Sequence, residues 1–276
     1  MVGKENWLDE EAGATLGSGV VGRLIESFKQ REEGAVGTLR LSGMGPKCPC
    51  ALWHSLYTPL AAEPLPPSAR IKYAYGHVIE ALVIAMAKAA GHEVTGEQDE
   101  LYVDGIRGHR DCVIDGNIVD VKSSSSRGFG KFKDGSIRND DPFGYLDQLD
   151  GYVVGSLHDP LVRNKTTGYL LAVDKTLGHM ALYEHTAREE SIRERIRYYR
   201  SIESLARPPE CTCGTVPDGK SGNIKLDVRA SYNAFKFSCN PHLRTFLYAT
   251  GPVYMTKVVR VPDVPEIDKH GHVVYN

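Results

Sequence analysis

Two aspartates and a lysine lie close together in one short stretch of the chain, at Asp111, Asp120 and Lys122. Between them lies Asp115-Gly116, flanked by apolar residues on both sides, and this pair is a strong signal for a tight hairpin turn. A two-residue turn at that place pairs Asp111 with Asp120, whereas a turn one residue later pairs Asp111 with Lys122. The stretch therefore predicts a hairpin that brings charged side chains together.

In both registers, the alternation of side chains along a strand puts the two aspartates and the lysine on one face. Two carboxylates opposite each other repel, and a divalent cation between them removes the repulsion. Oxygen ligands favour Mg²⁺ or Mn²⁺ over Zn²⁺, and a nearby lysine can stabilise the charge that develops at an attacked phosphate. The pattern indicates metal-dependent hydrolysis of a phosphodiester. A solvated edge hairpin with ordinary charges fits the same spacing, which alone does not decide between the two.

The elements that must position these residues follow from the periodicity of apolar side chains. A helix is expected from Ser68 to about Gly91, with a buried stripe made of Ile79, Leu82, Val83 and Met86. After it we expect strands over 93–103, 105–114 and 118–123, a Gly/Lys-rich loop over 124–141, a helix over 143–155, a hairpin of 168–173 and 179–183, and a helix over 187–206. This order predicts an α/β fold with a central mixed β-sheet flanked by helices.

Composition bounds the class of protein. The chain has 276 residues, 41% of them hydrophobic and 25% charged, which is typical of a soluble globular protein. The net charge of -2 means that any nucleic-acid surface must be local rather than global. No apolar run reaches the roughly 18 residues that span a bilayer, and the first residues are acidic rather than signal-like. We therefore expect a cytoplasmic protein without a membrane partner.

The chain is expected to divide into three parts. Residues 1–68 would form an N-terminal helical extension and linker, with an amphipathic helix on which Val20, Leu24 and Phe28 share one face. Residues 69–206 would form the core, and residues 207–276 a C-terminal extension that contains cysteines.

At the hairpin the sequence resembles the PD-(D/E)XK nuclease superfamily. The doublet reads Asp120-Val121-Lys122, and Asp111 is the upstream acid. The helix before the hairpin carries Glu80, which is similar to the acidic ligand that the family places on that helix. The resemblance implies a restriction-endonuclease-like core with extensions at both ends.

The helix after the hairpin strengthens the resemblance. Gln148 and Tyr152 are similar to the Gln-x-x-x-Tyr signature of the RecB-like branch, which includes lambda-type exonucleases and CRISPR-associated adaptation nucleases. The segments 108–116 and 140–145 look especially like nucleases encoded by tailed bacteriophages.

The resemblance implies a role for each of these residues. Asp111, Asp120 and the backbone carbonyl of Val121 would ligate Mg²⁺ or Mn²⁺, and Glu80 would complete or extend that set. Lys122 would be the catalytic lysine. His77 lies one turn before Glu80 and is either a further metal ligand or an ordinary histidine on the helix surface.

The function that follows is a DNA nuclease, most simply an exonuclease in phage DNA recombination, replication or degradation, in the host cytoplasm. The resemblance also implies a strand-annealing protein or a helicase as partner. A structure-specific or nicking endonuclease is an alternative within the same chemistry. A catalytically inactive nuclease-like module that binds DNA is an alternative outside it.

Residues around the hairpin are candidates for contact with DNA. Gln148 and Tyr152 would support the site or touch the strand. The segment after Lys122 offers Ser123, Arg127 and Lys131 for phosphates, with Phe129 and Phe132 for bases. The arginines of the helix over 187–206 are interpreted instead as a solvated face, because Glu189, Glu190 and Glu194 accompany them.

Six cysteines form the remaining pattern. In a cytosolic protein, clustered cysteines suggest metal ligation before disulfides. RecB-like nucleases often carry an iron-sulfur cluster on one cysteine before the core and three after it. Zinc is a second interpretation and free buried thiols a third, and Cys112 is expected in the core. The number of cysteines fits an iron-sulfur cluster, but their spacing fits it poorly. The candidate ligands are Cys48 or Cys50 before the core and Cys211, Cys213 and Cys239 after it.

Overall fold

The computed structural model describes residues 37–64, 67–269 and 271–274. Nearly all described residues belong to one compact unit that begins at Leu39. The amphipathic helix expected around Val20 to Phe28 lies outside the described residues, and the boundaries expected after residues 68 and 206 stay a prediction. No helix in the described part of the chain is long and apolar enough to cross a membrane.

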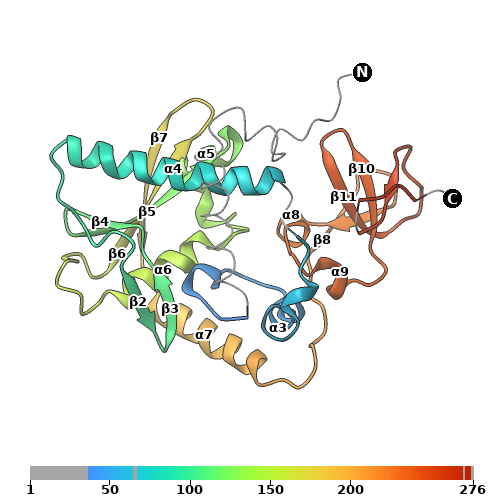
Figure 1. Ribbon diagram of the computed structural model, residues 1–276, viewed down its shortest axis with the longest axis horizontal. Helices are drawn as coiled ribbons and strands as arrows, with labels where there is room; N and C mark the ends of the chain where they lie inside the picture. Colours follow the sequence, from blue (N-terminus) through green and yellow to red (C-terminus); the bar gives the residue numbers. More distant parts are fainter. Residues whose placement is uncertain (1–36, 65–66, 270, 275–276) are drawn as a thin grey trace, which may run out of the picture. The chain divides into compact units, whose positions relative to one another are not determined.

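The centre of the described fold is a mixed sheet in the order β1-β4-β5-β6-β7 (Figure 1). Strands β5 and β6 are parallel, and their neighbours are antiparallel. Helices α4, α5 and α6 pack against the sheet, so the expected α/β fold with a central mixed sheet flanked by helices is confirmed. The bounds of these elements are Pro67–Ala89 for α4, Val94–Thr95 for β1, Cys112–Ile114 for β4, Asn117–Ser124 for β5, Ser126–Lys133 for α5, Tyr145–Gly155 for α6, Thr167–Asp174 for β6 and Met180–Thr186 for β7.

The hairpin of β4 and β5 has the first of the two registers considered for it. Ile114 pairs with Asn117, and Cys112 pairs with Val119. Asp115 and the glycine after it have φ values of 51° and 76°, the two left-handed conformations that a two-residue hairpin turn requires. One step further outward, Asp111 comes opposite Asp120.

The central part of β5 is buried on both faces of the sheet. On one face Ile118 packs with Leu149 and Tyr152 of α6 in the main core, and alternation along β5 puts Asp120 and Lys122 on that same face. On the other face, Val119 packs beneath Ile84 of α4 in a smaller cluster.

The buried stripe expected on α4 was partly wrong. Val83 and Ile84 are buried, whereas Leu82 and Met86 are 54% and 49% exposed. The sequence period does identify an amphipathic helix, but it does not fix which of two adjacent apolar rows faces the sheet.

Two of the expected strands are interrupted. Besides β1 and β4, the runs over 93–103 and 105–114 contain a separate hairpin of β2 (Glu100–Val103) and β3 (Ile106–His109). The interruption is centred on Arg110, which is 1% exposed and forms ion pairs with Asp99 at 2.8 Å and Asp159 at 2.6 Å. A buried guanidinium is strongly destabilising without such partners. The strand is interrupted where the chain bends so that the two aspartates reach the guanidinium.

The loop expected over 124–141 was wrong in its first half, where α5 forms. Ser125 caps this helix by accepting a hydrogen bond from the amide of Gly128 at 3.3 Å. Phe129 and Phe132 lie three residues apart on the helix and are 6% and 5% exposed in the main core. These two rings therefore pack inside the protein, and the expectation that they contact DNA bases is wrong.

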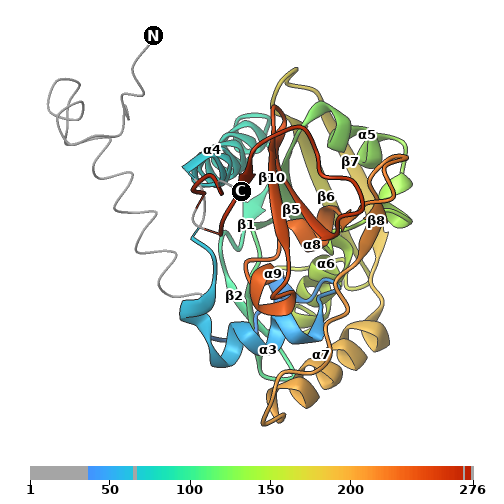
Figure 2. The same ribbon diagram turned by 90° about the vertical axis from the view of Figure 1, so that its right-hand side faces the viewer.

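The C-terminal segment forms a second sheet, in the order β12-β10-β11-β9-β8, which is antiparallel (Figure 2). Helix α3 contacts both α7 and α9. The remaining bounds are Leu41–Gly43 for η1, Pro49–Tyr57 for α3, Pro59–Ala61 for η2, Ser136–Arg138 for η3, Glu189–Glu203 for α7, Thr215–Pro217 for β8, Ile224–Leu226 for β9, Val228–Ser231 for α8, Lys236–Cys239 for α9, Arg244–Tyr248 for β10, Gly251–Lys257 for β11 and Glu266–Ile267 for β12.

Candidate functional site

Asp120 and Lys122 form an ion pair on the α6 side of β5. The lysine ammonium lies 2.6 Å from Oδ2 of Asp120, whose side chain is 1% exposed. Gln148 bridges the pair, since Lys122 donates to its Oε1 at 3.1 Å and its Nε2 lies 3.3 Å from Oδ1 of Asp120. The same Nε2 donates to the hydroxyl of Tyr152 at 2.7 Å. Four of the expected site residues thus form one hydrogen-bonded group.

Tyr145, the first residue of α6, also belongs to this group, although the sequence did not single it out. The ammonium of Lys122 lies 4.8 Å above the centre of its ring, which is the geometry of a cation-π contact. Burial alone would lower the pKa of Lys122, but Asp120 and Asp111 outweigh it and raise that pKa. The lysine is therefore held as a cation.

Asp111 directly precedes β4, one position beyond the outermost pair of the hairpin, which is Cys112 with Val119. Its Oδ2 accepts a hydrogen bond at 2.7 Å from the backbone amide of Val121, and it thereby takes the place of a backbone partner. Burial, with Asp120 adding like charge, raises the pKa of Asp111 to about 8. The two carboxylates therefore repel across the hairpin, as the sequence pattern predicts.

Glu80 reaches towards this group from α4. Its charge is among those that raise the pKa of Asp111, and its Oε1 accepts a hydrogen bond from Gln98 at 2.5 Å. His77 has its Nδ1 3.9 Å from Oε2 of Glu80 and is half exposed. Gln98 has a positive φ of 56°, and no sequence motif indicated it. Its position near Glu80 arises from the turn between β1 and β2.

The carboxylates suit a hard divalent cation by their chemistry, because oxygen donors are what Mg²⁺ and Mn²⁺ prefer. Oδ2 of Asp120 is buried and has no well-directed hydrogen bond despite its contact with Lys122, so one acceptor has unused capacity. Glu80, Asp111 and Asp120 are not drawn tightly together: in the described part of the chain, only four cysteines form a group of three or more possible ligands with donor atoms all within 4.8 Å.

The residues expected to contact DNA differ in whether they are paired with an acidic side chain. Ser123 and Lys131 line a pocket of about 170 Å³ next to Tyr145. Lys131 is paired with Asp140 at 2.6 Å, whereas Arg127 is exposed on α5 without an ion partner among the described residues.

The arginine-rich helix is α7. Arg193 pairs with Glu189 at 2.9 Å, and Arg197 pairs with Glu190 at 2.6 Å. Pairs of this kind on an exposed helix face contribute little to stability. The interpretation of these arginines as a solvated, internally paired face is confirmed for both pairs but is wrong for Arg195, which is 25% exposed and pairs with Asp147 of α6 at 3.5 Å.

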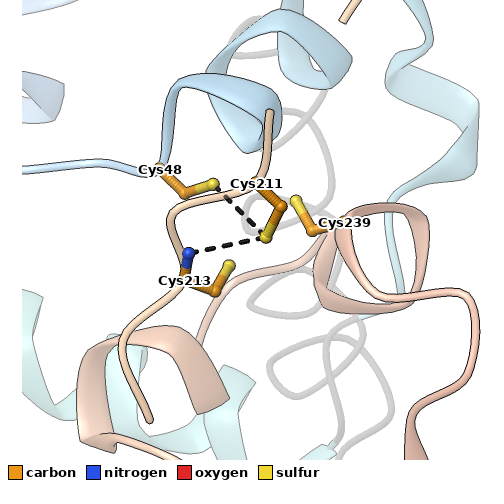
Figure 3. A group of neighbouring side chains, drawn as sticks. All are labelled: Cys48, Cys211, Cys213 and Cys239. Carbon is orange, nitrogen blue, oxygen red and sulfur yellow. Dashed lines mark hydrogen bonds between the residues drawn. The ribbon is translucent and has the colours of Figure 1, made fainter. Parts of the chain in front are cut away.

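Four of the six cysteines gather at one place, shown in Figure 3. Cys48 comes from the residue before α3, Cys211 and Cys213 from the segment after α7, and Cys239 from the end of α9. The Sγ atoms of Cys48 and Cys211 are 3.8 Å apart, and all four lie within 4.8 Å of one another. Cys50 is not part of the group.

Polar groups surround these sulfur atoms. Nδ2 of Asn233 lies 3.7 Å from Sγ of Cys213 and 3.6 Å from Sγ of Cys239. Hydrogen bonds from Cys213 and Cys239 lower the pKa of Cys48. Cys112, in contrast, is fully buried on β4 in a cluster with Ile84 of α4, and burial raises the pKa of its thiol to about 12. The expectation that Cys112 is a core residue is confirmed.

The four sulfur atoms lie close enough together to ligate a single ion. With a zinc-sulfur bond of about 2.3 Å, tetrahedral geometry separates neighbouring sulfurs by roughly 3.8 Å. The Cys48-Cys211 distance equals that separation, and the remaining distances exceed it by at most about an ångström. An iron-sulfur cluster holds several iron atoms between its cysteines and needs more room.

No protein-family model and no curated protein matches the chain. Among solved structures, SSO0001 is 17% identical over 80% of this chain and 96% of its own, with a TM-score of 0.46. A phage-related exonuclease from Haemophilus somnus 129PT is 16% identical over 60% and 92%, with a TM-score of 0.44. The alkaline exonuclease LHK-Exo from Laribacter hongkongensis, in complex with dAMP, is 12% identical over 62% and 88%, with a TM-score of 0.42. Likeness at this level does not assign an activity to this chain.

Proposed function

We propose that this chain is a metal-dependent deoxyribonuclease whose centre is formed by Asp111, Asp120 and Lys122. The observation that carries the proposal is a buried carboxylate, Asp120, that faces the half-buried Asp111 beside a lysine that is held as a cation. Such an arrangement is costly for a purely structural hairpin, because buried like charges repel. It suits a site that binds a divalent cation and a phosphate.

Asp111, Asp120 and the backbone carbonyl of Val121 are the proposed metal ligands. Glu80 completes or extends the set, and His77, half exposed beside it, is the outermost candidate. A bound Mg²⁺ or Mn²⁺ would polarise the scissile phosphate and favour ionisation of the attacking water.

Lys122 is the proposed catalytic lysine. Gln148 and Tyr145 fix its ammonium on the α6 side of the sheet, and Tyr152 in turn orients Gln148. From this position the ammonium stabilises the negative charge that grows on the phosphate oxygens during attack. Ser123, Arg127 and Lys131 are proposed to contact the backbone of the strand.

The substrate proposed is DNA cut from an end, which rests on the resemblance of the motifs to RecB-like nucleases. Phage recombination, replication or DNA degradation in the host cytoplasm, and a strand-annealing or helicase partner, rest on the same resemblance. A structure-specific or nicking endonuclease is the second candidate, because the site itself does not distinguish an end from an internal bond. The complete Asp/Asp/Lys set argues against an inactive DNA-binding module.

We further propose that Cys48, Cys211, Cys213 and Cys239 hold one structural zinc ion. Their spacing supports this choice over an iron-sulfur cluster. The ion would tie together the start of α3, the segment after α7 and α9.

A cleavage assay tests the nuclease. Purified protein is incubated with end-labelled linear duplex, linear single-stranded and covalently closed circular DNA, with Mg²⁺, with Mn²⁺ or with EDTA. We expect metal-dependent loss of linear DNA that EDTA and Lys122→Ala abolish. Cutting of the closed circle would identify an endonuclease instead. DNA binding without cleavage in either metal would contradict the catalytic proposal.

A further inference from the structure

A pocket of about 330 Å³ lies close to the candidate active site but is not lined by its carboxylates. Its walls come from three separate segments: residues 42–55, the Pro142-Phe143 turn before α6, and residues 212–214 and 229–235 of the C-terminal segment. The volume lies within the range of pockets that bind small molecules or parts of larger ligands. Nothing assigned above to the hydrolytic site uses this pocket.

A row of aromatic rings connects the pocket with the catalytic lysine. Lys122 lies over Tyr145, the Tyr145 ring is 5.7 Å from the ring of Phe143, and Phe143 is 5.7 Å from Tyr232. Phe143 and Tyr232 are 46% and 67% exposed. Their planes meet at 75°, so the edge of one ring touches the face of the other and open ring surface remains. Exposed rings of this kind are stacking surfaces for nucleobases.

Two cations line the same pocket without an acidic partner. Lys47 is exposed, Arg229 is half-buried, and neither forms an ion pair with any described residue. Lys131 and Arg193, in contrast, are each paired with a carboxylate. Unpaired cations beside exposed rings make a surface that complements an anion with an aromatic group.

The pocket wall that carries Lys47 is fixed in place. The hydroxyl of Tyr199 donates to the carbonyl of Gly45 at 2.5 Å and accepts from the amide of Lys47 at 3.1 Å. A Cβ added to Gly144 would lie 2.1 Å from Cα of Gly45, so these two glycines allow the segment to touch the Phe143 turn directly. A Cβ on Gly43 would lie 2.8 Å from Nζ of Lys47.

We infer that this pocket binds a nucleotide of single-stranded DNA next to the scissile bond. The base stacks on Tyr232 against Phe143, and Lys47 and Arg229 contact the phosphates on either side of it. The inference rests on the proposed nuclease function and adds to it a preference for an unpaired strand, because a base within a duplex cannot enter the pocket. The row of rings towards Lys122 gives the direction in which that strand reaches the site.

The test is binding of a fluorescein-labelled oligo-dT, followed by fluorescence anisotropy without added Mg²⁺ or Mn²⁺. Tyr232→Ala removes the stacking surface, and we expect it to weaken binding about tenfold. Tyr232→Phe keeps the ring and should bind like the unaltered protein, because no described residue bonds to the Tyr232 hydroxyl. Tyr102→Ala is the matched control, since Tyr102 is 55% exposed and lies on β2 outside the pocket.

The two cations are tested by salt dependence. Lys47→Gln and Arg229→Gln should each reduce the slope of log K against log salt by about 0.7, the value for one phosphate contact on a single strand. Lys220→Gln is the control, because Lys220 is exposed and outside the pocket.

Three other outcomes would overturn the inference. If the variants bind oligo-dT like the unaltered protein while Mg²⁺-dependent cleavage persists, the pocket is not the strand site although the nuclease stands. If Tyr102→Ala or Lys220→Gln weakened binding as much as the pocket variants do, the loss of binding would not be specific to the pocket. If the unaltered protein neither binds nor cleaves DNA, the proposed function and the inference both fail.

Discussion

The ammonium of Lys122 lies 2.6 Å from Oδ2 of Asp120, and the carboxylate is 1% exposed. A buried pair of this kind is compensated only while both charges are present. We expect a metal ion held by Asp120 to compete with the ammonium for this carboxylate, which would leave Lys122 available to a phosphate. In the proposed site, the ion pair would therefore link metal binding to the availability of Lys122.

The first prediction separates these two roles of Lys122. Lys122→Met keeps the length of the side chain and removes its charge, so cleavage should fall by at least about 100-fold. Mn²⁺ should bind this variant at least as tightly as the unaltered protein, because no ammonium competes for Asp120. Cleavage rates and isothermal titration calorimetry measure the two effects. Lys133→Met, an exposed position on α5, is the control, and near-normal cleavage by Lys122→Met would refute the assignment.

The second prediction concerns Asp111 and stability. Burial, with like charge from Asp120, raises the pKa of Asp111 from 3.8 to about 8. Between these values the folded protein keeps a proton that the unfolded chain has lost, so the free energy of unfolding contributed by this group falls as the pH rises. Without added metal, Asp111→Asn should stabilise the protein at pH 8 by roughly 1–3 kcal/mol.

Urea unfolding at pH 4.5 and at pH 8 measures this effect. The advantage of Asp111→Asn should be much smaller at pH 4.5, and Mg²⁺ should stabilise the unaltered protein at pH 8 more than the variant. A variant less stable than the unaltered protein at pH 8 would show that Asp111 is not a strained carboxyl.

The hairpin could be predicted from sequence because its signals are local. The turn requires left-handed conformations that Asp115-Gly116 tolerates, and the period of two along the strand then determines which side chains share a face. These features need only the chain on either side of them. Glu80 and Gln148, in contrast, were singled out by the resemblance to a nuclease family and not by a local signal.

The parts that sequence analysis missed depend on distant partners. Arg110 interrupts a strand because Asp99 and Asp159 are brought to it by the fold. Gln98 meets Glu80 only through a turn that no motif marks. The second sheet is built from short strands of two to seven residues, which are too short to show a clear period.

The third prediction concerns the cysteine group. Purified protein should contain about one zinc per chain by elemental analysis and should lack the visible absorbance of an iron-sulfur cluster. Cys211→Ser should lose the metal and unfold at a lower temperature, because the ion links three segments of the chain. Cys50→Ser is the control, since Cys50 lies two residues from Cys48 and outside the group. A brown protein with several irons per chain would contradict the zinc assignment.

The fourth prediction tests how α6 is held in position. Asp150 is fully buried, and its carboxylate lies 2.6 Å from Nε2 of His185 and 2.6 Å from the guanidinium of Arg188, whose backbone amide also donates to it at 2.9 Å. Asp150→Ala leaves these donors without their acceptor and should cost about 3–5 kcal/mol in the free energy of unfolding. Because Gln148 lies two residues before Asp150, cleavage should also fall under conditions where the variant remains folded.

Chemical denaturation and cleavage assays measure both effects. Glu190→Ala serves as the control, because it removes an exposed ion pair with Arg197 that contributes at most about 1 kcal/mol. Asp150→Asn keeps one acceptor oxygen for the donors of Arg188. Its free energy of unfolding should therefore lie between those of Asp150→Ala and Glu190→Ala. If Asp150→Ala is no less stable than Glu190→Ala, the contacts of Asp150 do not anchor α6, and Gln148 must be positioned by Tyr152 and Lys122 instead.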